Sequence, residues 1–319
     1  VTAFSNGVLL NALLTLSGNV TDNSAGVSAV QVSINNTTDT TFWGGTSWNT
    51  SEIYLSANVT SIGSTSTTWD YTSPEWQSPK SYLIKTKATD VATNVESIGI
   101  GNSFSIDNTA PTSSIVAPLN NAKVKSLSTI TGTSVDVSPG VISYVKITIR
   151  RVVDTNYWTG STWGTIGEVL LNASGTTSWY YTSVPAWGNG TQYVVNSKAY
   201  DTANNIESPG QSNTWTYDSI TPSSYITYPS NGSFAKSVAT ITGSASDTYT
   251  GINNVQVRIT RKSDTTYWTG SDWQTTENWQ NATGAPVWNP FTIGGANWST
   301  NVNYNITSKA TDGANNVET

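Results

Sequence analysis

The chain contains three copies of one sequence pattern, and this repetition limits its fold more than any other feature. The phrase KATDVATNVE at 87–96 returns as KAYDTANNIE at 198–207 and as KATDGANNVE at 309–318. Two sets of matching positions are 111 residues apart in consecutive copies: Asp90, Asp201 and Asp312, and Trp76, Trp187 and Trp298. A period of this length is that of a whole domain, so the sequence predicts three domains in tandem.

Each copy shows the pattern of short β-strands. The segments AVQVSI (29–34), YVKITI (144–149) and NVQVRI (254–259) place apolar residues at every second position, as in strands with one buried face. The segments DTTFWGGTSW (39–48), DTNYWTGSTW (154–163) and DTTYWTGSDW (264–273) place aromatic residues on both sides of a glycine-containing turn, which predicts a hairpin. With about seven strands in each copy and no helical periodicity, we expect an all-β chain of three immunoglobulin-like sandwiches, arranged as an elongated rod.

The repeats predict domains at residues 1–108, 109–219 and 220–319. The first copy begins within its first strand, and the third copy stops at Glu318–Thr319, where a last strand is expected. Two explanations are open for this strand. It continues in residues outside the sequence, or a neighbouring subunit donates it and builds a fibre by strand addition. Because the chain contains no methionine, we expect an interior or processed fragment of a longer polypeptide.

Several of the repeated motifs together resemble a known family. The motifs ITGTSVD (130–136), DTNYWTG (154–160), KATDVATNVES (87–97) and DNTAP (107–111) are similar to those of tandem Ig-like repeats in bacterial surface and secreted proteins. The resemblance implies a stalk, adhesin or fibre without catalytic activity of its own. Two features depart from it. Thr93, Asn204 and Asn315 stand where the common D-x-A-G-N turn has glycine, and the linker DNTAP becomes DSITP at 218–222.

Composition excludes several functions. The formal net charge of −6 leaves no basic face for phosphates, so nucleic acid and anionic membranes are not expected partners. The chain has no histidine and no cysteine, so neither a histidine-based nor a thiolate catalytic site can form, and we expect no enzyme. The longest apolar stretch, at 7–16, is too short to span a bilayer. We expect an extracellular or cell-surface location.

Oxygen-bearing side chains in the repeated phrase make calcium the one cofactor to consider. Calcium is bound by carboxylate and amide oxygens. The candidate ligands lie in the phrase and in the linkers, and they are Asp90, Asn94, Glu96, Asp107, Asp201, Asn205, Glu207 and Asp218, with Asp312, Asn316 and Glu318 as the equivalents in the third copy of the phrase. Such a cation would stiffen turns or inter-domain joints. The alternative is that each aspartate only organises its own turn by hydrogen bonds to the backbone.

Tryptophan suggests a second kind of site, because an exposed indole can stack on a sugar ring. Most of the 14 tryptophans recur at equivalent positions in all three copies, which favours a role in the core. Trp215 and Trp279 have no tryptophan at the equivalent positions of the other copies and are the better candidates for exposed glycan contacts.

The sequence therefore predicts a structural repeat region of an extracellular filament, stalk or adhesin. It would act as a spacer and associate with other copies of itself or with neighbouring repeats through strand edges. A ten-residue strand is about 33 Å long, so three modules in line would extend on the order of 100 Å. The alternatives are an array of glycan-binding modules and an accessory region of a secreted hydrolase.

Overall fold

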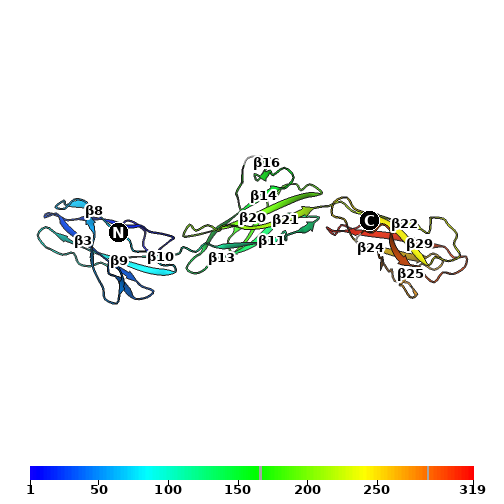
Figure 1. Ribbon diagram of the computed structural model, residues 1–319, viewed down its shortest axis with the longest axis horizontal. Coiled ribbons are helices and arrows are strands. Elements are labelled where there is room, and N and C mark those ends of the chain that lie inside the picture. Colours follow the sequence, from blue (N-terminus) through cyan, green and yellow to red (C-terminus); the bar gives the residue numbers. More distant parts are fainter. Residues whose placement is uncertain (165–166, 286) are drawn as a thin grey trace.

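The computed structural model describes residues 1–164, 167–285 and 287–319, and it contains three β-rich bodies in a row (Figure 1). We call them repeat 1, repeat 2 and repeat 3, with the residue ranges 1–108, 109–219 and 220–319. The described residues form strands, turns and loops, and no helix occurs among them. The described residues therefore include no helical membrane span.

Repeat 1 has two sheets. The larger has the strand order β1-β10-β9-β3-β4-β5, with β6 also paired to β3, and the smaller has the order β2-β8-β7. β1 runs parallel to β10, and the other pairs are antiparallel. The strands are β1 (Val8–Leu10), β2 (Thr15–Thr21), β3 (Val27–Asn36), β4 (Thr41–Trp43), β5 (Trp48–Asn49), β6 (Leu55–Ser56), β7 (Asn58–Val59), β8 (Ser66–Thr72), β9 (Lys80–Asp90) and β10 (Asn102–Ile106).

Repeat 2 has the same arrangement with one more strand. Its larger sheet is β12-β21-β20-β14-β15-β16, with β17 on β14, and its smaller sheet is β11-β13-β19-β18. The strands are β11 (Thr112–Ala117), β12 (Ala122–Val124), β13 (Ile130–Val135), β14 (Ile142–Arg151), β15 (Tyr157–Trp158), β16 (Trp163–Gly164), β17 (Leu171–Asn172), β18 (Ser174–Gly175), β19 (Ser178–Tyr181), β20 (Thr191–Asp201) and β21 (Gln211–Tyr217).

Repeat 3 has one sheet of β26-β25-β24-β27, with β29 on the other edge of β24, and a second sheet of β22-β23-β28. Within the described residues, β29 pairs only with β24, whereas its counterparts β9 and β20 also pair with a last strand. The strands are β22 (Ser223–Tyr228), β23 (Thr240–Ser246), β24 (Ile252–Arg261), β25 (Thr266–Trp268), β26 (Trp273–Gln274), β27 (Gln280–Asn281), β28 (Phe291–Gly294) and β29 (Tyr304–Asp312).

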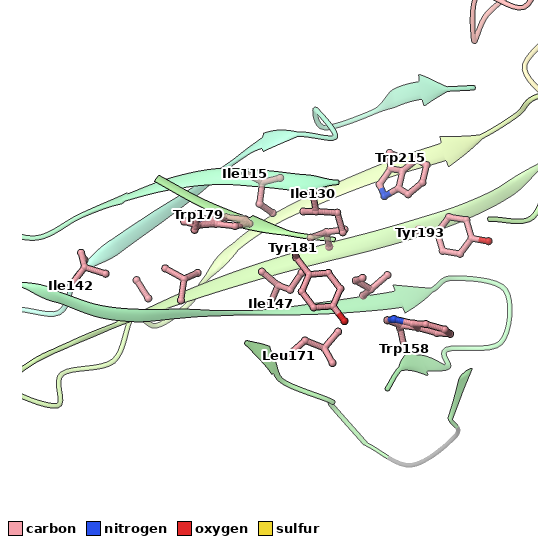
Figure 2. Close-up of a cluster of buried hydrophobic side chains, with 14 residues drawn as sticks. Ile115, Ile130, Ile142, Ile147, Trp158, Leu171, Trp179, Tyr181, Tyr193 and Trp215 are labelled. Atoms are coloured by element: carbon pink, nitrogen blue, oxygen red, sulfur yellow. The ribbon is translucent and has the colours of Figure 1, made fainter. Parts of the chain in front are cut away.

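Each repeat encloses its own hydrophobic core, as the period-two pattern predicts. On β14, Val145, Ile147 and Ile149 are fully buried, and the equivalent residues of β3 and β24 are buried as well. Figure 2 shows the core of repeat 2, in which the ring of Tyr181 from β19 lies beside Ile147 of the facing sheet. The three cores contain no residue in common. The prediction of an all-β chain of immunoglobulin-like sandwiches is confirmed.

The predicted aromatic hairpins are present in all three repeats. Trp43 is directly opposite Trp48 in repeat 1, and the equivalent tryptophan pairs are in register in repeats 2 and 3. The turn glycine of each hairpin has a left-handed φ of 97° to 100°, a conformation that side-chain-bearing residues adopt only with strain. This backbone requirement explains why glycine recurs at that turn position.

Candidate metal sites at the joints between repeats

Strand ends of two successive repeats meet at each joint and bring three aspartates together. At the first joint, Asp107 follows β10 of repeat 1, while Asp136 follows β13 and Asp201 ends β20 of repeat 2. One carboxylate oxygen from each lies within 4.8 Å of the others. Asp107 and Asp201 are only 1% and 2% exposed, whereas Asp136 is half-buried, so the cluster is partly shielded from water.

Backbone amides hold these carboxylates in place. Asp201 accepts hydrogen bonds from the backbone N–H and the side-chain amide of Asn205, each at 2.7 Å. Asp107 accepts from the N–H of Thr109 at 3.1 Å, and Asp136 accepts from the N–H of Val137 at 2.8 Å. The side chains are therefore fixed before any ligand binds.

Two carboxylate oxygens of this first cluster have no hydrogen-bond donor. Oδ2 of Asp107 and Oδ2 of Asp136 are both buried and unpartnered, and both point at the space beside the Cα of Gly140. Burial raises the pKa of Asp107 and of Asp136 above the ordinary value, and the neighbouring carboxylates raise the pKa of each further. Buried like charges with two oxygens that lack a donor are unfavourable unless something neutralises them.

The second joint repeats the arrangement with Asp218 after β21, Asp247 after β23 and Asp312 at the end of β29. Asp218 and Asp312 are completely buried. More donors reach this cluster than the first. The Thr250 hydroxyl donates to Asp218 at 2.7 Å, and Oδ2 of Asp247 accepts from three backbone N–H groups. Oδ1 of Asp247 is buried without a donor.

Hydrogen bonds also cross both joints directly. The side-chain amide of Asn205 donates to the backbone carbonyl of Asp107, and Asn316 donates to the carbonyl of Asp218, each at 2.8 Å. At the second joint, Lys123 and Lys125 of repeat 2 add bonds to backbone carbonyls of repeat 3, at 2.6 and 2.7 Å. Each joint is therefore a bonded contact as well as a covalent linker.

The structure brings together only some of the residues that the sequence suggested as calcium ligands. Asp107 and Asp201 share the first cluster, and Asp218 lies in the second. Asn205 orients the aspartates of the first joint through its amide nitrogen. Asp90 and Asn94 form the same turn in repeat 1 but join no group of three acids among the described residues.

The glutamates among the suggested calcium ligands lie outside the clusters. Glu207 accepts hydrogen bonds from the N–H and hydroxyl of Ser113 and from the N–H of Ala199. It therefore joins β11 to β20 within repeat 2. The equivalent Glu96 is exposed and accepts only from the N–H of Ala88.

Asp136 and Asp247 are the site residues that the sequence reasoning missed. Both end the phrase that reads LSGNVTD, ITGTSVD and ITGSASD in the three copies. A carboxylate at the same position of a thrice-repeated phrase was the available signal. The phrase by itself does not show which strand end its aspartate faces in the folded chain.

All tryptophans except Trp279 belong to one of the three cores or pack against it. The expected exposed contact at Trp215 is wrong, because β21 directs this indole into the core of repeat 2, where it is 1% exposed and packs on Trp187 and Tyr193. The hairpin tryptophan pairs are tilted by 53° to 60°, so neither partner extends the plane of the other.

Trp279 is half-buried and lies on the surface of repeat 3. The ammonium group of Lys309 lies 4.2 Å from its ring centroid, and the guanidinium of Arg258 lies 4.8 Å from it. Its N–H donates to Glu277 at 3.0 Å. This indole is therefore surrounded by charged groups, in contrast to the buried tryptophans.

The sequence matches no protein-family model. It also matches no curated protein. Among solved structures, the chain is similar to fibronectin(III)-like modules of CbhA from Clostridium thermocellum, with 16% identity, a TM-score of 0.35, and coverage of 68% of this chain and 92% of that chain. It is similar to the FN1-FN3 domains of chicken CNTN1, with 12% identity, a TM-score of 0.32, and coverage of 94% and 90%.

A third similarity is to dimeric latent PorU from Porphyromonas gingivalis, with 14% identity and a TM-score of 0.23. This match covers 96% of this chain and 31% of that chain. All of these overall superpositions are weak. The assignment of the sandwich fold therefore depends on the strand pairing and the cores of the chain itself.

Proposed function

We propose that this chain is a non-catalytic structural repeat region of an extracellular filament, stalk or adhesin, in which each repeat is one domain and the array acts as a spacer. The observation that carries the proposal is the separation of the three cores along one line, with bonded joints between them (Figure 1). A linear array of this kind sets a distance between its two ends.

Short linkers and cross-joint hydrogen bonds support a stiff spacer. Only Asp107–Pro111 and Asp218–Pro222 separate the last strand of one repeat from the first strand of the next. Proline fixes its own φ and restricts the residue before it. The amides of Asn205 and Asn316 bond the end of one repeat to the turn of the next.

The proposal includes self-association through a strand edge. Among the described residues, β29 pairs with β24 along one edge and otherwise has only the isolated bridge between Thr311 and Val317. Phe234, in the loop between β22 and β23, is fully exposed. An open strand edge is a surface on which an extended segment can add. A second copy of the chain or an adjoining repeat is the partner of suitable chemistry.

Small-angle X-ray scattering combined with sedimentation velocity tests the spacer. We expect an extended particle with a maximum dimension on the order of 100 Å or more, since each module is about one ten-residue strand long. A dimension close to that of a 34 kDa sphere would contradict the proposal. Electron microscopy of concentrated samples tests self-association, for which we expect end-to-end or lateral assemblies.

Trp279 favours one alternative, a glycan-binding array. Its half-buried indole lies on the surface of repeat 3 among polar groups, and such a ring can stack on a sugar. Titration with soluble oligosaccharides, followed by tryptophan fluorescence, compares the chain with its Trp279→Ala variant. Saturable binding that this substitution abolishes would support the alternative. The accessory-region alternative depends on an active domain in the same polypeptide and is tested by its flanking sequence.

A further inference from the structure

We propose that each joint binds one divalent cation of the calcium type, held by Asp107, Asp136 and Asp201 at the first joint and by Asp218, Asp247 and Asp312 at the second. The proposal does not depend on the spacer role, because cation binding is measured directly whatever the array does. It assigns a ligand to the two most acidic buried places in the described part of the chain.

The clusters lack the partners that buried carboxylates normally have. None of the six aspartates forms an ion pair with lysine or arginine in the described residues. The first cluster leaves two buried carboxylate oxygens without a donor, and the second leaves one. Isolated buried charges are strongly unfavourable, and such groups are normally paired or coordinate a metal.

The geometry matches a hard cation with oxygen ligands. Calcium–oxygen distances are about 2.3–2.6 Å, so two ligand atoms of one ion are separated by no more than about 5 Å. The carboxylate oxygens of each cluster lie within 4.8 Å of one another. Three carboxylates supply three to six of the six to eight oxygens that calcium takes, and water can supply the rest.

Repetition at two joints argues against chance juxtaposition. In both clusters, one carboxylate comes from the end of the preceding repeat and two come from strand ends of the following repeat. The asparagine four residues after the β20 or β29 aspartate orients both sides in the same way. Binding a cation there therefore requires both repeats, and it would fasten one to the other.

The two joints differ in a way that predicts their order of affinity. At the second joint, the ammonium group of Lys123 donates to the carbonyl of Thr250, whose hydroxyl in turn donates to Asp218. The equivalent position at the first joint is Leu9, since β1 pairs with β10 as β12 pairs with β21, and leucine carries no charge. A nearby positive charge opposes a second cation, so we expect the first joint to bind more tightly.

Repeat 1 provides an internal comparison. Asp22 and Asp90 are the equivalents of Asp136 and Asp201, and both line a groove of about 400 Å³ at the far end of repeat 1. No third carboxylate joins them among the residues described. If three carboxylates are required, this pair binds calcium much more weakly than either joint.

Isothermal titration calorimetry of the whole chain with calcium, after chelator treatment, tests the proposal. We expect two calcium ions per chain, with different affinities, and weaker binding of magnesium, which requires stricter geometry. Asp136→Asn should weaken the tighter site by at least about tenfold, since loss of even an outer partner of a ligand costs that much. Asp247→Asn should do the same to the weaker site.

Asparagine keeps the shape of each side chain and one acceptor oxygen, so both variants should fold, and circular dichroism checks this. The matched control is Asp272→Asn, which removes one exposed negative charge from the turn between β25 and β26, at the end of β24 opposite Asp312, and should leave both sites intact. Small-angle X-ray scattering in calcium and in chelator then shows whether the array bends more freely without the ion.

Three outcomes would overturn the proposal. One is that calorimetry detects no saturable heat of calcium binding up to about 10 mM calcium, a concentration above the dissociation constants of weak extracellular modules. Another is calcium binding that both joint variants leave unchanged. The third is a melting temperature that is insensitive to calcium but rises on mild acidification, because a shared proton would then neutralise the clusters.

Discussion

Gly132 on β13 lies beneath the indole of Trp179, and a single methyl group added there tests whether the recurring tryptophans fill separate cores. A Cβ on Gly132 would overlap the Trp179 ring and also the backbone carbonyl oxygen of Ser114 on β11. β13 lies between β11 and β19 in the smaller sheet of repeat 2, so neither neighbour can move without breaking ladder hydrogen bonds.

The loss in the free energy of unfolding depends on which atoms the added methyl group would overlap. Extra atoms in a packed core cost about 1–3 kcal/mol, and the upper end applies where a backbone atom must shift. For Gly132→Ala we expect a loss of about 3 kcal/mol in the free energy of unfolding of repeat 2. At the equivalent Gly18 the nearest atoms all belong to the Trp69 ring, at 2.7 Å, so Gly18→Ala should cost about 1–2 kcal/mol.

Urea denaturation monitored by tryptophan fluorescence measures both variants, with the Gly294→Ala variant as the matched control. Gly294 also lies in a strand, β28, but no atom lies within 4 Å of its Cβ position, so alanine should be neutral within about 0.5 kcal/mol. If Gly132→Ala were as stable as this control, the indole would not pack against β13. The interpretation of the tryptophans as core residues would then be refuted.

The remaining predictions concern a turn, a buried glutamate and an ion pair. Thr93 has a left-handed φ of 70°, so Thr93→Asn should stabilise repeat 1 by about 0.5–1 kcal/mol in urea, and the reverse exchange at the equivalent asparagine of repeat 2 should destabilise that repeat. Glu207 is 7% exposed and accepts three hydrogen bonds, so Glu207→Gln should lower the free energy of unfolding by about 1–3 kcal/mol in the same assay. Glu96 is exposed, so Glu96→Gln should lower it little. Equal losses of stability in the two variants would contradict this prediction. The hydrogen bond from Arg261 lowers the pKa of Asp264 from 3.8 to about 2, so the stability that it contributes is present above pH 3.8 and is lost as the pH falls through about 2. An NMR titration of the Asp264 carboxyl with a midpoint near the ordinary value would show this to be wrong.

The sandwiches themselves could be predicted because their signals are local. Alternation along one strand decides which face is buried, as at Val145, Ile147 and Ile149, and this holds whichever strand lies beside it. The Trp-Gly-Trp hairpins are local in the same sense, since a turn requiring positive φ identifies itself by its glycine. Because the pattern is repeated, each of these signals occurs three times in the sequence.

The candidate sites could be predicted only in part. Asp201 and Asn205 are four residues apart, and their hydrogen bonds follow from the turn that the sequence indicates. The sequence does not predict that Glu207 accepts hydrogen bonds from Ser113, because the two residues are 94 positions apart in the chain. The burial of Trp215 is of the same kind, since the facing sheet decides which side of β21 lies inside.

The sequence by itself determined that there are three copies, that each is built of half-buried strands, and that the recurring tryptophans belong to the cores, because these properties depend on spacing along the chain. Only the tertiary structure decided that Asp107, Asp136 and Asp201 meet within 4.8 Å. They lie at the ends of three strands from two repeats, and a joint forms only after each sandwich has paired its own strands. The packing of one folded repeat against the next therefore created the acidic clusters.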